Sequence, residues 1–332
     1  MMTHPPARRV RRSWLRGDNI TTLSLVVSFI VMCIFFTTQT EFFLTLTNLE
    51  NLARTLAVVG VTSIGMTLVM ISGGVDISVG SVAALSGVLA SMFWLGFGVP
   101  LALSTFLGLL GGTLVGLVNG VIVTVLKINP LITTLATFSI IRGLAFVISE
   151  GQTNLLSNPT FNFIGRGDIA GIPFSLLLMV LLYLVFGFIL RFTPFGRNLY
   201  AIGGNPDMSR LAGIAVARHL LIVYTLCGFL AALGGIITAS QLAASAPRAA
   251  IGLEFTVITA VVLGGTSLAG GKGTLIGTIV GVIMLRVLNN GLVLMAVSSF
   301  YQDVARGAVL LLAVSFDQIR LGLSRIGRRG AV

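Results

Sequence analysis

The chain has little charge, little histidine and little cysteine. Charged residues make up 9% of its 332 residues and hydrophobic residues make up 55%, whereas soluble domains carry about 25% charged residues. This composition excludes an ordinary soluble domain. The two cysteines, Cys33 and Cys227, lie inside apolar stretches, and the two histidines, His4 and His219, lie in a tail and at a loop end. Such scarcity indicates neither a disulfide framework nor a metal site.

Long stretches without charge take up most of the chain. They cover residues 19–40, 55–75, 77–126, 169–190, 219–247 and 255–271. About 18–20 apolar residues cross ~30 Å of hydrocarbon as a helix. The sequence therefore predicts an all-α polytopic membrane protein with about ten transmembrane helices, near 20–38, 54–72, 79–97, 100–126, 131–149, 174–190, 219–242, 254–268, 273–296 and 301–317. An eight-span arrangement, with one glycine-rich pair re-entrant, is the alternative.

The positive charges predict the orientation. Five arginines precede the first predicted span and four follow the last, and 15 of the 21 Lys and Arg residues fall on one side of the predicted topology. The positive-inside rule makes that side cytoplasmic, with both termini. We expect a cytoplasmic basic tail at 1–18, one transmembrane domain at 19–318 and a second cytoplasmic tail at 319–332. Because the basic residues cluster at the ends of the predicted spans, the net charge of +11 does not indicate nucleic-acid binding.

A compact basic loop between Arg191 and Arg218 interrupts the apolar chain. It contains four arginines and a single acid, Asp207. Asn205 with Pro206 is typical of a helix start, and a glycine follows at a suitable distance to end the helix. A short helix with an apolar side, exposed in the cytoplasm, predicts a docking point for a partner rather than a simple connector. This loop comprises Asn205, Pro206, Asp207, Met208, Ser209, Arg210, Leu211, Ala212, Gly213 and Ile214.

Polar residues are rare within the predicted spans. Asp76, in SGGVDISVGS, either takes part in function, because a carboxylate near membrane depth is costly, or caps the next helix beside Ser78. Arg142 can pair with Glu150, snorkel outward or face a water-filled path. Most such side chains bond between helices, and a minority face a substrate. The candidates for a translocation path or gate are Asp76, Ser78, Asn119, Thr133, Thr134, Asn289 and Asn290.

Glycine is abundant, and part of it is regularly spaced. Small residues four apart line one helix face and let a neighbouring backbone approach closely. We expect this helix-packing role for Gly108, Gly112, Gly116, Gly120, Gly273, Gly277 and Gly281. GGTSLAGGKG, at 264–273, is not a phosphate loop, because Lys272 is followed by glycine instead of Ser or Thr. Without nucleotide or catalytic motifs, the chain is expected to be no enzyme and to bind no cofactor or metal itself.

Several long motifs occur together in order. They are SGGVDISVGS at 72–81, KINPLITTLATFSIIRGLAF at 127–146, FGRNLYAIGGN at 195–205, RLAGI at 210–214, VVLGGTSLAGGKGTLIGT at 261–278 and LNNGLVLMAVSSFYQDVARGAVLLLAV at 288–314. In these motifs the chain resembles the membrane permease subunits of ABC-type sugar importers, in the ribose/arabinose branch. The resemblance covers nearly all of 55–316.

The resemblance implies a set of partners in a bacterial inner membrane. These are a second permease copy in the lipid bilayer, a cytoplasmic ATPase that binds the ATP, and an extracytoplasmic sugar-binding protein. In ABC importers a loop with the pattern Glu-Ala-Ala-x-x-x-Gly docks on the ATPase; here Asp207, Met208, Ser209 and Gly213 occupy the defined places, so both alanines are replaced.

The resemblance also implies ATP-driven import of a monosaccharide, and we expect a pentose such as ribose or arabinose. A thousandfold gradient requires about 4 kcal/mol, and the chain has no visible means of supplying it. The alternative is a secondary sugar transporter coupled to protons or sodium, which would use Asp76, Glu254 or Asp303 as ion-binding groups.

Overall fold

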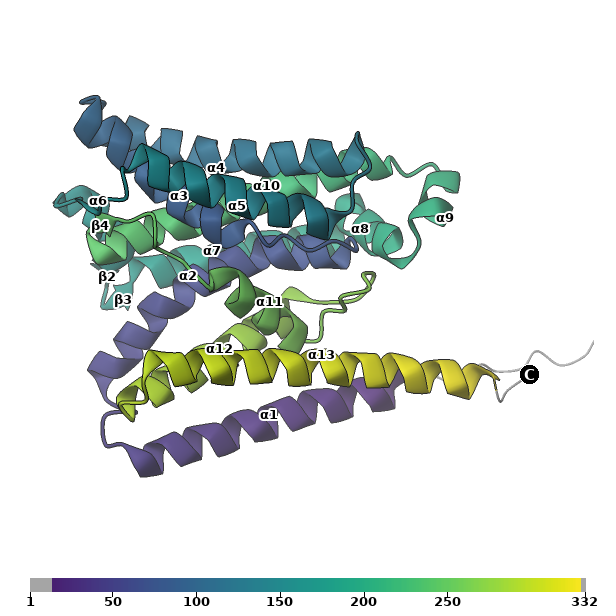
Figure 1. The fold of residues 1–332 in the computed structure, drawn as a ribbon. Helices are drawn as coiled ribbons and strands as arrows, with labels where there is room; N and C mark the ends of the chain where they lie inside the picture. Colours follow the sequence, from purple (N-terminus) through teal and green to yellow (C-terminus); the bar gives the residue numbers. More distant parts are fainter. Residues whose placement is uncertain (1–13, 330–332) are drawn as a thin grey trace, which may run out of the picture.

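The computed structural model describes residues 14–329, and this part of the chain is almost entirely helical (Figure 1). Its only strands have two residues each and form two antiparallel pairs: β1 (Asn154–Leu155) with β4 (Ala244–Ser245), and β2 (Asp168–Ile169) with β3 (Ile172–Pro173). The helices are α1 (Trp14–Gln39), α2 (Leu46–Ile71), α3 (Val79–Ser91) with the π-helical turn η1 (Met92–Gly96), α4 (Leu101–Thr124), α5 (Pro130–Ile148), α6 (Pro159–Arg166), α7 (Phe174–Phe192), α8 (Pro194–Gly204), α9 (Pro206–Leu211), α10 (Val216–Leu242), α11 (Leu253–Leu263), α12 (Leu275–Leu294) and α13 (Ser299–Arg329).

The all-α prediction is confirmed, and a helix lies at each of the ten predicted spans. Within the described residues, seven helices are long and apolar enough to cross a membrane: α2, α3 with η1, α4, α5, α7, α10 and α12. The predicted span at 254–268 is wrong in its extent. There α11 has 11 residues, or ~16 Å of helix, because glycines with positive φ follow it at Gly265, Gly270 and Gly271.

The two predicted tails are partly helical. The helix α1 already begins at Trp14, and α13 continues through the predicted tail to Arg329. Residues 1–13 and 330–332 lie outside the described part of the chain.

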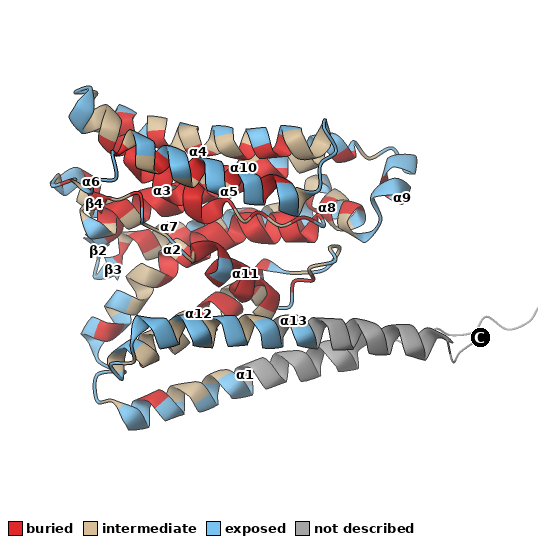
Figure 2. Cartoon of the chain, viewed as in Figure 1, coloured by how far each residue is buried: buried red, intermediate tan, exposed pale blue. Residues whose placement is uncertain are grey.

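The helices form two groups with α2 and α11 between them (Figure 1). In one group α3, α4 and α5 pack together, and α10 contacts α2, α3 and α4; in the other, α12 packs against α11 and α2, and α13 packs against α11. Burial is concentrated on α2, α3, α10 and α11, while many residues of 27–39 in α1 and 299–312 in α13 are exposed (Figure 2). Large apolar side chains such as Ile34 and Leu311 are among them, as expected for surfaces in lipid.

Three glycines of the predicted stripe of α4, Gly112, Gly116 and Gly120, lie against α10, while Gly108 lies against α3. A Cβ added to Gly116 would lie 2.9 Å from the Cα of Gly228, and one added to Gly112 would meet the methyl group of Ala232. On α12, Gly277 faces the backbone of Gly264 and Gly281 faces the backbone of α11, whereas Gly273 lies in the preceding loop. Since lipid competes poorly for helix faces that fit this closely, backbone contact holds the helices together.

Replacing Gly116 with alanine is expected to destabilise the packing of α4 on α10. The added Cβ would approach the Gly228 backbone, and overpacking of a filled interface costs about 1–3 kcal/mol. The thermal unfolding midpoint of the purified protein in detergent measures the loss. The control is Gly143→Ala, on the exposed face of α5, where an added Cβ has no neighbour within 4 Å. Equal midpoints for the two variants would contradict the role of the glycine stripe.

Candidate functional site

A buried polar network lies in the loop between α2 and α3. The side chain of Asp76 is 1% exposed. Its Oδ1 accepts hydrogen bonds from the backbone N–H of Ser78 at 2.9 Å and from the hydroxyl of Ser78 at 2.6 Å. The helix α3 begins at Val79, and Ser78 before it makes no side-chain cap bond. Asp76, from two residues before the N-cap position, supplies the acceptor for an N–H at this end of the helix, as the capping alternative expects.

The network continues onto α4 and α5. Asn119 of α4 donates to the hydroxyl of Ser78 at 3.0 Å, and Thr137 of α5 donates to the Oδ1 of Asn119 at 2.7 Å. The hydroxyl of Thr134 accepts from the N–H of Ile77 at 3.2 Å. Four predicted path residues, Asp76, Ser78, Asn119 and Thr134, therefore lie together, and each one bonds to another segment of the chain or to the same loop. This arrangement fixes the loop to two helices.

The other predicted path residues lie elsewhere. Asn290 of α12 and Asn48 of α2 form a reciprocal pair of amide hydrogen bonds at 3.0 and 2.8 Å. Thr133 is buried, and its hydroxyl has no hydrogen-bond partner. Asn289 lines a small cavity of about 20 Å³ between α11, α12 and α13. The predicted path residues thus occupy separate places and do not form one site.

Arg142 holds the loop that precedes α11. Its Nη1 donates to the carbonyl oxygens of Pro247 and Ala249, both at 2.8 Å. Among the alternatives for this arginine, pairing with Glu150 is therefore wrong. The nearer acid, Glu254, accepts from the N–H of Gly252 at 3.2 Å and lies at the start of α11. Both side chains support the turn from β4 into α11.

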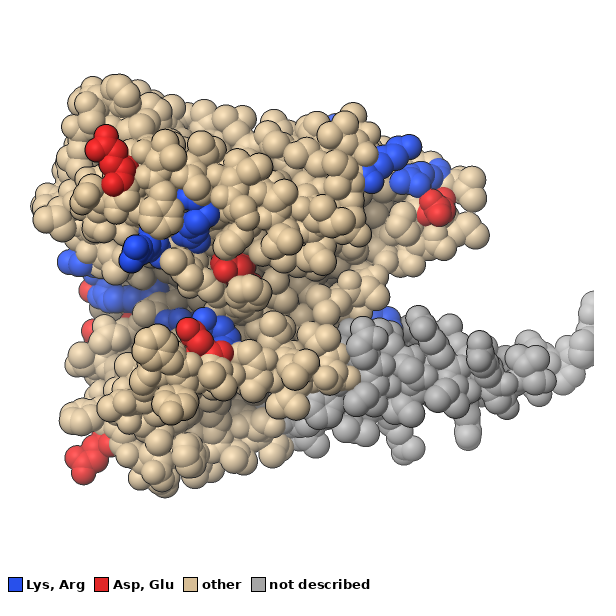
Figure 3. Space-filling model, viewed as in Figure 1, with Lys and Arg blue, Asp and Glu red and all other residues tan. Residues whose placement is uncertain are grey.

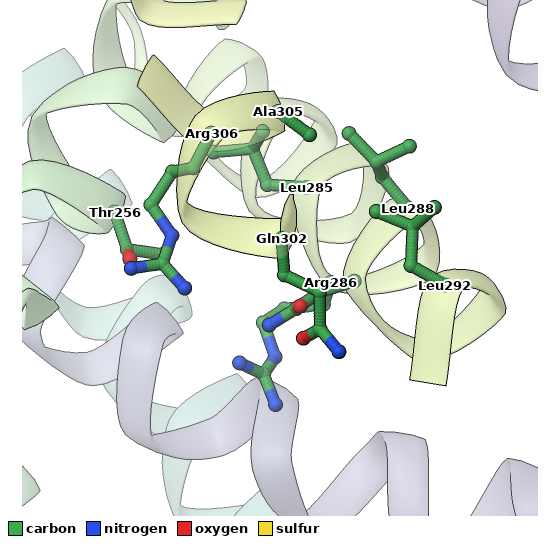
Figure 4. Close-up of a pocket in the computed structure, with 9 residues that line it drawn as sticks. Thr256, Leu285, Arg286, Leu288, Leu292, Gln302, Ala305 and Arg306 are labelled. Atoms are coloured by element: carbon green, nitrogen blue, oxygen red, sulfur yellow. The ribbon is translucent and has the colours of Figure 1, made fainter. Parts of the chain in front are cut away.

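A second and larger cavity, of about 230 Å³, lies between α2, α10, α11, α12 and α13. Two arginines, Arg286 of α12 and Arg306 of α13, line both this cavity and the smaller one. Figure 4 shows the guanidinium group of Arg306 beside Thr256 and that of Arg286 nearer to Gln302, both away from Leu288 and Leu292. Figure 3 shows charged side chains gathered where the two helix groups meet.

The search for polar residues in the sequence missed these two arginines as site residues. Arg286 lies in the predicted span 273–296, and Arg306 lies in the predicted span 301–317, three residues after Asp303. A cation within a span is itself a signal for a functional position, and this signal, which Arg142 also carries, could have identified them. The larger cavity is lined by Thr55, Val58, Val59, Thr238, Gln241, Ala250, Ile251, Gly252, Leu253, Thr256, Arg286 and Arg306.

The basic loop folds into two short helices at the end of the molecule opposite α6 (Figure 1). The side chain of Asn205 accepts from the N–H groups of Asp207 and Met208 and so begins α9. Arg210 forms an ion pair with Asp207 at 2.8 Å. Beyond α9, Gly213 has φ +81°. The start and end of the helix therefore lie where the sequence predicts them.

Two apolar side chains of α9 are exposed. Met208 is 62% exposed and Leu211 is 83% exposed, while Ser209 is buried against the rest of the chain. A six-residue helix cannot bury these side chains itself, and the described part of the chain does not cover them. The exposed pair gives α9 an apolar surface with a charged pair beside it.

Behind α9, the end of α8 touches two glycine-rich loops. Gly203 packs against the carbonyl of Ile71 at the end of α2 and against the backbone of Gly271. The N–H of Gly271 donates to the carbonyl of Ile71 at 2.9 Å, and the hydroxyl of Tyr200 donates to the carbonyl of Gly273 at 2.9 Å. Burial raises the pKa of the Tyr200 hydroxyl above its ordinary value. We call this contact of 71–74, 200–204 and 270–273 the glycine junction.

Comparison with known proteins gives consistent matches. The family described as "Branched-chain amino acid transport system / permease component" matches residues 48–314. The chain is 43% identical over 273 residues to the ribose import permease protein of Bacillus subtilis, which covers 82% of this chain and 84% of that protein. It is 39% identical over 319 residues to the L-arabinose ABC transporter permease protein of Azospirillum brasilense, covering 95% of this chain and 92% of that protein. No solved structure matches the chain significantly.

Replacing Asp76 with alanine is expected to destabilise the protein by about 1–3 kcal/mol, because the N–H and hydroxyl of Ser78 would both lose their acceptor in a buried place. Asp76→Asn is the matched control, since its amide oxygen keeps an acceptor there. We expect Asp76→Asn to melt close to the native protein in a thermal unfolding assay and to transport at a similar rate. An Asn variant as impaired as the Ala variant would show instead that the negative charge is required.

Proposed function

Since the chain belongs to the family of permease components described as the branched-chain amino acid transport system / permease component, we propose that it is the membrane permease subunit of an ATP-driven ABC importer for a pentose. The observation that carries the proposal is its similarity to ribose and L-arabinose permeases over more than four fifths of its length. With seven membrane-length helices in its described part, it is a multi-pass protein of the bacterial inner membrane.

The surface of α9 supports a cytoplasmic ATPase as partner. Met208 and Leu211 offer an apolar contact, and the Asp207–Arg210 pair offers hydrogen bonds at its edge. The acid and the glycine of the docking pattern stand at Asp207 and Gly213, but Met208 and Ser209 replace its alanines. Because the side chain of Met208 is larger than the alanine of the pattern, the shape of this surface differs from that of the usual docking helix. We therefore expect it to bind specifically to an ATPase with a matching surface.

The glycine junction supports a route from the ATPase to the membrane helices. A push on α9 reaches α8, and the end of α8 rests directly on backbone atoms of the two loops that begin α3 and α12. Backbone contacts without intervening side chains transmit displacement with little slack. In alternating access, ATP-driven movement of α9 would then shift both helix groups, and the second permease copy would undergo the same change.

Two of the three candidate acids do not favour the ion-coupled alternative, because Asp76 is bonded within its own loop and Asp303 pairs with Arg306 at 3.1 Å. Glu254 accepts from the N–H of Gly252 through Oε1, and its Oε2 has no hydrogen-bond partner. An ion-coupled carrier needs a carboxylate free to release and rebind its ion. The relatives include a ribose import permease protein and an L-arabinose ABC transporter permease protein. We therefore assign the energy supply to ATP bound by a partner subunit and expect no cofactor in this chain.

The outer face offers contacts for an extracytoplasmic sugar-binding protein. The segment 150–173 folds over this end of the molecule, where Arg54 pairs with Asp168 at 2.7 Å and Arg166 donates to the carbonyl of Gln241 at 2.7 Å. These bonds tie the cover to α2 and α10. We propose that the binding protein docks here, delivers its sugar and sets most of the selectivity.

Replacing Leu211 with aspartate is expected to weaken ATPase association at least about tenfold, because a charge would enter the apolar centre of the contact. Association is measured by pull-down of the tagged ATPase from detergent-solubilised membranes. The matched control is Leu155→Asp on β1 at the outer end, which is similarly exposed at 72%. Unchanged association in the Leu211 variant would overturn the assignment of α9 as the docking helix.

A further inference from the structure

Two guanidinium groups without a full set of partners line one cavity. Arg306 forms an ion pair with Asp303, whose side chain is 67% exposed. Arg286 takes part in no ion pair of the described residues, and its Nε is buried without a hydrogen-bond partner. The larger cavity, of about 230 Å³, is lined by both arginines and by no acid. Positive charge at this depth is costly and is retained where it has a use.

The other polar side chains that line this cavity can accept hydrogen bonds, which the two guanidinium groups cannot do. The hydroxyls of Thr55, Thr238 and Thr256 each donate to a carbonyl of their own helix or of its first turn, and their oxygens can still accept. The guanidinium groups can only donate. The cavity therefore offers donors on the α12 and α13 side and acceptors on the side of α2, α10 and α11. A molecule with several hydroxyl groups satisfies both sides at once, because each hydroxyl both donates and accepts.

We propose that this cavity, which we call the arginine chamber, holds the sugar during its passage through the permease, with Arg286 and Arg306 donating to its hydroxyl oxygens; the proposal rests on the function proposed above. The chamber is smaller than the ~300–1,000 Å³ of sites for drug-sized ligands, which suits a monosaccharide. A neutral sugar binds weakly enough to leave, as transport requires, whereas an anion would be held by the charge of Arg286, which no acid of the described residues pairs. That charge also repels cations and opposes their leak along the path.

The test uses the permease in proteoliposomes with its ATPase and binding protein. A cysteine replaces Ile251, which lines the chamber and is 66% exposed, in a Cys33→Ser background, where Cys227 is buried. The labelling rate by a membrane-impermeant maleimide is measured with D-ribose, with L-arabinose and with ribonate, the corresponding anion. We expect a neutral pentose to slow labelling severalfold. We also expect Arg286→Met to abolish this protection and to lower pentose uptake about tenfold, as for one lost charge-assisted hydrogen bond.

The controls separate the chamber from a general effect on folding. Val293→Met changes an exposed residue of the same helix and is expected to keep both protection and uptake, and Arg286→Lys is expected to keep part of each. The chamber proposal fails if protection persists in the Arg286→Met protein, if no pentose protects while native uptake proceeds, or if ribonate, which the charge of Arg286 should also hold, gives no protection. A native complex that takes up no pentose at all would refute the proposed function, and the chamber assignment with it.

Discussion

The structure depends on close backbone contact between helices in a solvent that offers no hydrogen bonds. Lipid neither drives apolar helix faces together nor satisfies a stray polar group. The chain brings its helices together with glycine: Gly116 lies against Gly228 where α4 crosses α10, and Gly277 lies against Gly264 where α12 meets α11. At the end of the molecule that carries α9, Gly203 makes the same kind of contact with the end of α2. The two helix groups, and the point where a partner can move them, are built from one type of interaction.

This constraint also explains where the polar residues lie. A buried carboxylate such as Asp76 is tolerated because Ser78 supplies two donors and Asn119 extends the network to α4. The network holds the loop between α2 and α3, which is one of the two loops that α8 touches. Arg286 lacks such a set of partners: it forms no ion pair with the described residues, its Nε has no hydrogen-bond partner, and it lines the arginine chamber. Its remaining donors are therefore the ones that we assign to a ligand.

The sequence predicted the helices well, because long uncharged runs and regularly spaced glycines are local features of the chain, and the uncharged runs determine which segments cross the membrane. It also predicted the start and end of α9 from Asn205, Pro206 and Gly213. It did not predict that α11 is half-length, since an apolar run continues past the residue where its helix ends. Nor could it group the path candidates: Asn290 bonds to Asn48, 242 residues earlier, and such long-range pairs follow from tertiary packing alone.

The measurement that tests the central claim most directly is uptake of labelled pentose into proteoliposomes that contain the permease, its ATPase and its binding protein. With ATP supplied on the ATPase side and all ion gradients collapsed by ionophores, the account predicts accumulation of the pentose above its outside concentration. Accumulation that needs an ion gradient and proceeds without ATP would contradict it, because the energy would then enter through the permease itself instead of through the surface of α9.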